Sequence, residues 1–209
     1  MIRNATQETP EGTAAGAAME TAAKIAREVT WRGRGVGLVP LEADDTELMG
    51  AWRSDPTAAQ AIGFWPRPLS SLRERIERDI DDADRDDFVV VLPDGTPIGH
   101  IALANQNFAD ATAEVHLMLD AQHRGQGHGT DALDALTDLA FGELPLHRLQ
   151  ADTHTDNAAA LSVLARSGYV REGVRRSACL HRGRRHDLAM LSLLREEWEG
   201  LDRPRSWEL

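Results

Sequence analysis

The feature that most constrains the fold is a change of sequence period at a glycine-rich loop. Upstream of the loop, segments 88–92, 98–105 and 113–119 have strand character, and Asp94-Gly95 is a strong turn signal between the first two. Downstream of the loop, leucine and alanine recur at helical spacing over residues 127–142. An antiparallel meander that runs into a glycine loop and a long helix predicts a domain of mixed α and β structure.

The remaining segments extend this pattern in both directions without an internal repeat. They predict strands at 36–41, 146–153, 169–174 and 188–194, and helices that start at Asp44 or Asp45, at Ser70 or Ser71 and at Asp156 or Asn157. An arginine-rich connection joins the last two strands, and 63–68 is expected to be a rigid aromatic loop. The predicted fold is a single α/β (α+β) domain. Its central sheet is mixed, mostly antiparallel, with about seven strands and about four flanking helices.

The predicted domain covers residues 34–200. An alanine-rich leader, residues 1–33, precedes it and is expected to be flexible or to hold a short helix over 19–29. Glycines at 33, 35 and 37 mark a flexible entry into the domain. Residues 201–209 form a C-terminal tail.

Charge and composition exclude several classes of function. The 209 residues carry a net charge of −11, which argues against a nucleic-acid partner. No uninterrupted apolar stretch is long enough to span a bilayer, so we expect a cytoplasmic protein without a membrane partner. The single cysteine, Cys179, rules out a disulfide framework, and the eight histidines show no zinc-site spacing, so no metal is expected.

The glycine loop is a candidate phosphate site. Three glycines allow a tight turn and close approach to a ligand, and the helix that follows offers unpaired N–H groups and a positive dipole end. Gly127, Gly129 and Ala132, with Asp152 at the end of the next strand, also satisfy the dinucleotide-binding fingerprint. Five polar or small residues separate the preceding strand from the first glycine, and the upstream strands form a meander, which both count against that fingerprint. A plain glycine turn is the third alternative.

A more specific pattern lies in the same loop. Arg124, Gly127 and Gly129 match the sequence Arg/Gln-x-x-Gly-x-Gly/Ala, and Gln122, Gly125 and Gly127 match it a second time. This pattern resembles the signature of the GCN5-related N-acetyltransferase (GNAT) family.

The resemblance covers roughly residues 36–198. Asn157, followed by Gly168-Tyr169, is similar to the family's second helix motif, Asn-x-x-Ser/Ala…Gly-Phe/Tyr. Segments 113–119 and 187–194 are similar to the branch typified by the ribosomal-protein N-terminal acetyltransferases RimJ and RimL. Four matches in the family's order make the resemblance specific.

The resemblance implies acetyl-CoA as co-substrate, in a cleft where the fourth and fifth strands splay apart. The loop would hold the pyrophosphate, the end of the preceding strand would pair with the pantetheine arm, and the first residue of the second helix would bond the pantetheine or sulfur end. The cofactor-binding residues implied in this way are Arg124, Gly125, Gln126, Gly127, His128, Gly129, Thr130, Leu117, Met118, Leu119 and Asn157.

The resemblance further implies direct attack of an amine on the thioester in a ternary complex. Glu114 is the candidate general base, and His116, on the same strand face if the period-two pattern holds, is a candidate second base. The alternatives are that Glu114 pairs with an arginine on a neighbouring strand and that His116 is a packed, hydrogen-bonded residue. The family's usual acid tyrosine is replaced by Leu164, so water is left to protonate the leaving thiolate.

Two other features leave alternatives open. Cys179 could form a covalent acyl intermediate or be an unremarkable loop cysteine. The arginine-rich segment 171–185 could hold an acidic group of the acceptor or the nucleotide phosphate of CoA. Alternatively, it is a solvated loop that balances the charge of the acidic helix that starts at Ser70 or Ser71.

Three functions are consistent with these residues. The leading one is an acetyl-CoA-dependent N-acetyltransferase that acts on an α-amine of a protein or peptide. The second is acetylation of a small amine such as an amino acid, a polyamine or an antibiotic. The third is a non-catalytic module that senses acyl-CoA. A homodimer is a possible assembly.

Overall fold

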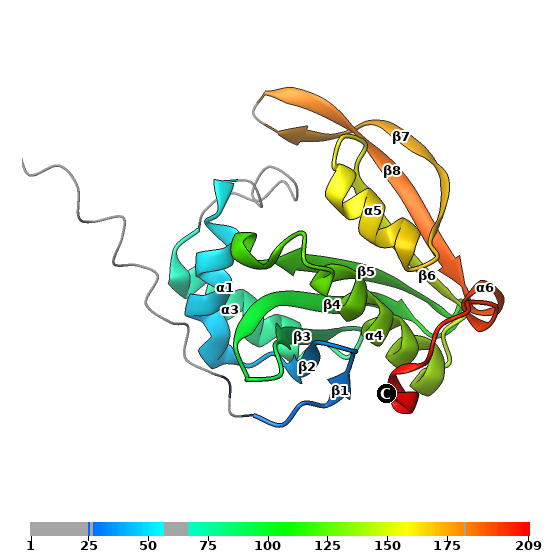
Figure 1. The fold of residues 1–209 in the computed structure, drawn as a ribbon. Helices are drawn as coiled ribbons and strands as arrows, with labels where there is room; N and C mark the ends of the chain where they lie inside the picture. Colours follow the sequence, from blue (N-terminus) through cyan, green and yellow to red (C-terminus); the bar gives the residue numbers. More distant parts are fainter. Residues whose placement is uncertain (1–24, 26, 57–66, 182) are drawn as a thin grey trace, which may run out of the picture.

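The computed structural model describes residues 25, 27–56, 67–181 and 183–209. Its sheet has eight strands in the order β1-β2-β3-β4-β5-β6-β8-β7 (Figure 1). Neighbouring strands are antiparallel except β5 and β6, which run parallel. The predicted class is therefore confirmed, with one strand more than expected. The strands are β1 (Trp31–Arg32), β2 (Gly37–Pro40), β3 (Asp86–Val91), β4 (Pro97–Asn107), β5 (Thr112–Leu119), β6 (Arg148–His154), β7 (Val170–His181) and β8 (Arg184–Leu194).

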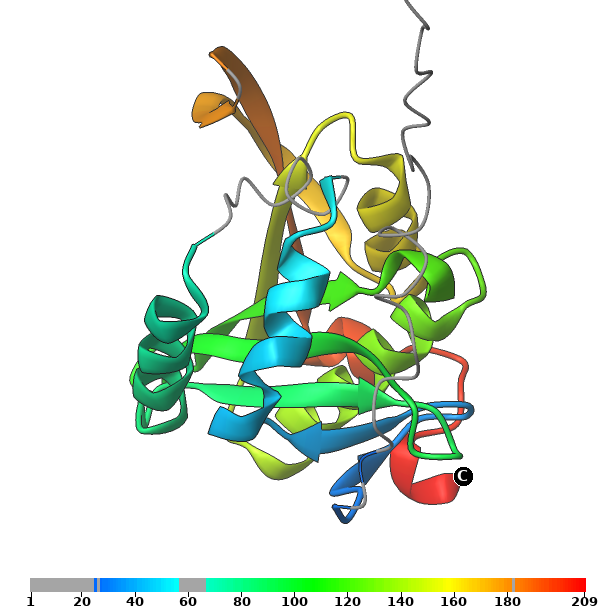
Figure 2. The same cartoon turned by 90° about the vertical axis from the view of Figure 1, so that its left-hand side faces the viewer.

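Helices cover both faces of the sheet, and Figure 2 shows α3 and α4 on opposite sides of it. On one face, α4 and α5 pack over the larger apolar core, and on the other face α1 and α3 pack over a smaller one. In the described part of the chain the helices are α1 (Thr46–Arg53), α3 (Leu69–Ile80), α4 (His128–Glu143), α5 (Ala158–Arg166) and α6 (Arg195–Glu199), with short 3₁₀ turns at Ala43–Asp45, Ala121–His123 and Ser206–Glu208.

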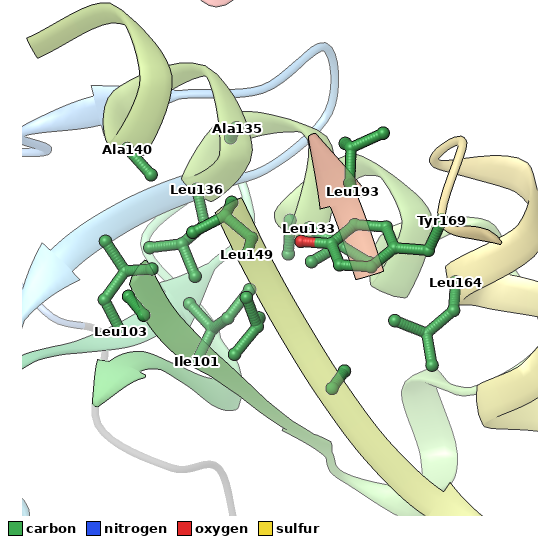
Figure 3. Packing of buried hydrophobic residues seen from close by; sticks show 14 of the residues in the cluster. Ile101, Leu103, Leu133, Ala135, Leu136, Ala140, Leu149, Leu164, Tyr169 and Leu193 are labelled. Carbon is green, nitrogen blue, oxygen red and sulfur yellow. The ribbon is translucent and has the colours of Figure 1, made fainter. Parts of the chain in front are cut away.

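The larger core forms where the apolar stripe of α4 meets the middle of the sheet. Leu133, Leu136 and Ala140 recur at helical spacing and are fully buried, as expected for one face of an amphipathic helix. They pack against Ile101 and Leu103 of β4 (Figure 3). Close packing of this kind fixes α4, and with it the loop that precedes α4, rigidly on the sheet.

The strands β5 and β6 separate soon after they begin to pair. Thr112, Ala113 and Glu114 lie opposite residues 148–150 of β6, and no later residue of β5 pairs with β6. Beyond this point β6 continues with β8 alone, over residues 148–154. The sheet therefore opens into a fork whose vertex is at Glu114. The resemblance implies such a splay between the fourth and fifth predicted strands, which are β5 and β6 here.

The expected flexible entry at the glycines is instead an ordered turn. The backbone amides of Arg34 and Gly35 donate to the carboxylate of Asp131 on α4, at 2.8 and 2.7 Å. A side chain on Gly33 would overlap that carboxylate, since its Cβ would lie 2.7 Å from Oδ1. This turn joins β1 to β2, and β1 is the strand that the sequence did not predict. A contact across almost a hundred residues leaves no local pattern in the sequence.

The arginine-rich connection is also not a loop. It is the distal half of a long β7–β8 hairpin, which pairs up to His181 and Arg184 and turns through Gly183 at φ +74°. Figure 1 shows this hairpin projecting past the rest of the sheet. Polar side chains on an edge hairpin lack the apolar alternation of a buried strand, so the segment has the composition of a loop.

Two sequence predictions fall largely outside the described residues. These are the helix over 19–29, whose described end at 27–29 is not helical, and the aromatic loop over 63–68, of which only the last two residues are described.

The final residues of the chain pack on α4: Arg203 donates to the buried carboxylate of Asp138 at 2.7 Å, and Trp198 donates to it at 2.8 Å. None of the described helices has the length and apolar character needed to cross a membrane.

Candidate active site

A cleft of about 1330 Å³ lies at the fork between β5 and β6. Its described lining combines the free edge of β5, the glycine loop, one face of α5, parts of α1, α3 and β3, and residues of β6 and of the β7–β8 hairpin. Most of the predicted site residues meet here: Glu114, His116, Leu117, Met118, Leu119, Arg124, Gly125, Gly127, Gly129, Thr130 and Asn157 line the cleft. Gln126 and His128 belong to the same loop but do not line it.

The open edge of β5 carries free backbone groups. The amide of Asp120 donates to the carbonyl of Ile98 on β4 at 2.9 Å, so even-numbered residues at this end of the strand direct their backbone groups toward β4. By the alternation of a strand, the backbone groups of Leu117 and Leu119 point the other way, into the fork. An extended ligand can pair with them as an added strand.

The glycine loop ends at the N-terminus of α4. Gly125 and Gly127 have φ of +75° and +91°, which L-residues with side chains rarely adopt, and Gly127 is the N-cap of the helix. A Cβ at either glycine would meet nothing within 4 Å, so the space in front of both is open. The unpaired amides of the first helical turn border this open space. They suit an anion such as a pyrophosphate.

Arg124 holds the loop against the end of β5. Its guanidinium donates to the carbonyl of Leu119 through Nε at 3.0 Å and through Nη2 at 2.8 Å, and Nη2 also donates to Asp55 at 2.7 Å. The side chain is thus engaged with the protein, and its contribution toward a phosphate is the shape of the loop and the backbone amide. The carbonyl of Leu119 is also occupied by this contact.

Glu114 lies at the vertex of the fork, half-exposed to the cleft. Its Oε1 accepts a hydrogen bond from Nε2 of Gln150 on β6 at 3.3 Å, and its Oε2 lies 3.6 Å from Nε2 of His116. The expected shared face of the two β5 residues is therefore observed, and the described partners of the carboxylate are a glutamine and a histidine rather than an arginine. The side chain of His116 is half exposed. Partial desolvation in the cleft, and then the charge of Arg85, lower its pKa below 6.5, so the neutral imidazole predominates at pH 7.

A second histidine on the neighbouring strand has a different role. Nε2 of His100 on β4 lies 2.6 Å from the Asp87 carboxylate, which also pairs with Arg85. Burial raises the pKa of Asp87, but the hydrogen bonds from His100 and Arg85 outweigh it and hold the pKa below 3.8. His100 is buried, and its contact with Asp87 supports the ion pair between Asp87 and Arg85.

Asn157 caps α5 at the far side of the fork. Its Oδ1 accepts from the amide of Ala160 at 3.2 Å, and its Nδ2 donates to Thr153 at 3.1 Å. Each group keeps one further hydrogen-bonding position that can face the cleft.

Tyr169, the only tyrosine in the chain, is buried against Thr137 of α4 and does not line the cleft. Burial raises its pKa above 10, and it cannot act as an acid there.

Cys179 and three histidines, His154, His181 and His186, gather where β6 and the hairpin border the cleft. Sγ of Cys179 lies 3.2 Å from Nε2 of His154, whose ring stacks on His186 at 4.9 Å and 13°. Burial, and then the charge of His186, lower the pKa of His154. Ligand atoms of His154, Asp156 and His186 lie within 4.8 Å of one another.

Sequence reasoning missed the part of the cleft that α1, α3 and β3 supply. Arg53, Arg75, Asp79 and Arg85 line it, as does Gln150 of β6. No local motif marks these residues, because the topology alone brings them together. Of the arginines in the hairpin whose side chains are described, Arg175 alone lines the cleft, and it pairs with Asp152.

Comparison with known proteins agrees with this geometry. Residues 36–170 match the acetyltransferase (GNAT) domain family. The putative ribosomal N-acetyltransferase YdaF of Bacillus subtilis is 34% identical over 110 residues, which cover 53% of this chain and 60% of YdaF. The probable N-acetyltransferase YjcK of Bacillus subtilis is 30% identical over 173 residues, 82% of this chain and 93% of YjcK.

The fold has a close match among solved structures. A crystal structure of spermidine N-acetyltransferase from Vibrio cholerae, in complex with CoA and spermine, superposes with a TM-score of 0.75 at 22% identity. The match covers 79% of this chain and 99% of that one. With the family match over most of the predicted domain, and a 30% identical N-acetyltransferase relative over 82% of the chain, the chain belongs to the GNAT family of N-acetyltransferases.

Proposed function

We propose that the protein transfers the acetyl group of acetyl-CoA to the α-amine of a protein or peptide, by direct attack in a ternary complex. The observation that carries this proposal is the fork between β5 and β6. An open strand edge, the free N-terminus of α4 and the Glu114 carboxylate all face one cleft there.

The chain's own residues suit the donor. Backbone amides from Arg124 to Thr130 would bind the pyrophosphate, with Gly125 and Gly127 leaving room for it. The backbone of Leu117, and the amide of Leu119, would pair with the pantetheine arm, and Asn157 would bond its sulfur end. This arrangement aims the thioester at the vertex of the fork, where Glu114 lies.

Glu114 would supply the base for the transfer. The amine nitrogen attacks the thioester carbonyl carbon, a C–N bond forms, the C–S bond breaks, and the proton of the amine passes to the Glu114 carboxylate directly or through water. The CoA thiolate leaves and takes a proton from water, which its pKa of ~8.5 permits. An α-amine, with a pKa of ~7.7–8.0, is far easier to deprotonate than a lysine at ~10.4.

A second candidate acceptor is a small amine. The similarity to a spermidine N-acetyltransferase supports it, and the similarity to a putative ribosomal N-acetyltransferase supports the peptide acceptor. The volume of the cleft, about 1330 Å³, admits both the donor and the end of a peptide.

The experiment is release of free CoA thiol from acetyl-CoA against a panel of peptides, amino acids and polyamines, with mass spectrometry of the products. We expect thiol release with peptides and an acetylated N-terminus. Release with small amines only would transfer the assignment to the second candidate. Binding of CoA by calorimetry, without thiol release on any amine, would indicate a non-catalytic acyl-CoA sensor and contradict the proposal.

A further inference from the structure

Three side chains that can ligate a metal lie together where β6 ends beside the β7–β8 hairpin. His154 is the last residue of β6, Asp156 follows it by two positions, and His186 lies on β8. Each residue offers one ligand atom, and the three atoms lie within 4.8 Å of one another. Two nitrogen ligands of one tetrahedral zinc ion lie about 3.3 Å apart, because each zinc–nitrogen bond is about 2.0 Å long. Side-chain rotation alone can therefore close the three residues around an ion.

The register of the sheet explains why these side chains meet. His154 lies opposite Leu188 of β8, and His186 is two residues before Leu188, so the alternation of a strand places both imidazoles on one face of the sheet. Cys179 of β7 lies opposite His186 and belongs to the same face. The sequence did not predict a metal, because these residues are distant in the chain and only the strand order brings them together.

Cys179 holds the His154 ring on the side away from Asp156. Its Sγ lies 3.2 Å from Nε2 of His154, whereas Nδ1 of the same ring lies 4.0 Å from Oδ1 of Asp156. The two ring nitrogens thus have separate neighbours, a thiol and a carboxylate. A contact to the remote nitrogen of a ligating histidine fixes the orientation and the tautomer of its ring, as in established metal centres. His154 is also buried, so packing holds its ring as well.

His186 and Asp156 are the adjustable members of the cluster. The half-buried His186 ring stacks on His154, with 4.9 Å between the ring centroids and 13° between the planes. Binding of one ion by both rings requires His186 to turn out of this stack about its Cβ–Cγ bond, and that torsion is soft in histidine. The Asp156 side chain is exposed and can follow the movement.

We propose that His154, Asp156 and His186 bind a divalent transition-metal ion of the zinc type, which ties the β7–β8 hairpin to the turn between β6 and α5. Two imidazoles and one carboxylate are a common ligand set for such ions, whereas magnesium and calcium take oxygen ligands. His154 lines the cleft and Asn157 follows directly after this turn, so the ion would stiffen one wall of the cleft. This inference does not depend on the proposed function.

The test is calorimetric titration of zinc chloride into the chain, prepared without a histidine tag, treated with EDTA and then freed of it. We expect one zinc ion to bind per chain and an excess of magnesium chloride to leave the binding unchanged. A ligand that binds the folded state alone stabilises it, so zinc should also raise Tm.

Variants at the two adjustable residues identify the site. Asp156→Asn and His186→Gln change an exposed and a half-buried side chain, so both variants should fold. Each should weaken zinc affinity at least about tenfold and reduce the rise in Tm. The matched control is His147→Gln, which changes an exposed histidine 3.9 Å from Glu196, outside the cluster, and should leave zinc affinity unchanged.

No binding of zinc would overturn the proposal. Equal zinc affinity in the wild type and in both ligand variants would also overturn it, because the ion would then bind elsewhere on the surface. The titration contains neither acetyl-CoA nor an amine, so its result is independent of the thiol-release experiment. Failure of one experiment leaves the conclusion from the other in place.

Discussion

Glu114 and Gln150 are the last two residues of β5 and β6 that lie opposite each other before the strands separate, and a hydrogen bond of 3.3 Å joins their side chains. This pair fixes the carboxylate at the vertex of the fork. A base held in this position needs little reorganisation to meet an amine that enters along the open edge of β5.

Replacement of Glu114 tests its role as base. Glu114→Gln keeps the size of the side chain and removes its basicity, so kcat should fall about 100-fold or more. Affinity for CoA, measured by calorimetry, should not change, because the loop that would bind it is untouched. Turnover equal to that of the wild type across the pH range would contradict the assignment.

His116 should contribute less. Its lowered pKa leaves it neutral at pH 7 and protonated only in more acidic solution, where it loses its ability to accept a proton. His116→Gln should reduce kcat less than about tenfold and leave an acid limb in the pH profile. If that limb disappears in His116→Gln and persists in Glu114→Gln, the two roles are reversed.

The open space at Gly127 predicts a specific loss of donor binding. Gly127→Ala introduces a side chain at φ +91° and should cost about 1–2 kcal/mol of stability and weaken CoA binding. The matched control is Gly183→Ala in the hairpin turn, at φ +74° with nothing within 4 Å of the new Cβ. That variant should carry a similar backbone strain and keep CoA affinity. Equal CoA affinity in both variants would exclude the loop as the phosphate site.

The buried carboxylate under the C-terminal segment should govern stability in acid. Asp138 accepts hydrogen bonds from Trp198, Arg203 and Ser206. Burial raises its pKa, but the bond from Arg203 and the others outweigh this and lower the pKa below 3.8. Asp138→Asn removes the carboxylate at 2.7 Å from Arg203 and leaves only the longer pair with Asp134 at 3.7 Å, so it should reduce the free energy of unfolding by about 3 kcal/mol.

The sign of the pH dependence follows from this depressed pKa. The native state binds fewer protons at Asp138 than the unfolded state. The contribution of the ionised Asp138 carboxylate to the free energy of unfolding is therefore complete above about pH 3.8, and it is lost as the pH falls through the pKa of the native state. Chemical unfolding between pH 6 and pH 2 should show a steep loss of stability in the wild type below about pH 3.8, and a smaller loss in Asp138→Asn, because only the other carboxylates with lowered pKa still contribute. Asp202→Asn, an exposed carboxylate of the same segment, serves as the control.

Direct transfer predicts that the thiol is dispensable. Cys179 is half-buried beside His154 in the hairpin, and the proposed reaction makes no bond to it. Cys179→Ser and Cys179→Ala should keep kcat within about twofold. Loss of activity in both, together with an acetylated cysteine detected by mass spectrometry in the wild type, would support a covalent intermediate instead.

The features that the sequence predicted depend on contacts between residues that are close in the chain. The features that it did not predict depend on partners that are distant in the chain or on an edge position in the sheet. The glycine loop, the strand before it and the helix after it were predictable, because turn chemistry and the hydrophobic period act over a few residues. The turn that Asp131 holds at Gly35 and the strand character of the arginine-rich hairpin were not. Both depend on partners that lie elsewhere in the chain or on an edge where apolar alternation is absent.

By itself, the sequence determined the class of fold and the residues able to receive a phosphate and a proton: Gly127 at the helix start and Glu114 on the strand. Only the tertiary structure decided what surrounds them. The separation of β5 from β6 makes the cleft, and α1, α3 and β3 bring Arg53, Arg75 and Arg85 to its wall. Charge compensation is a property of distances in space, so the electrostatic character of the acceptor site exists only once the chain has folded.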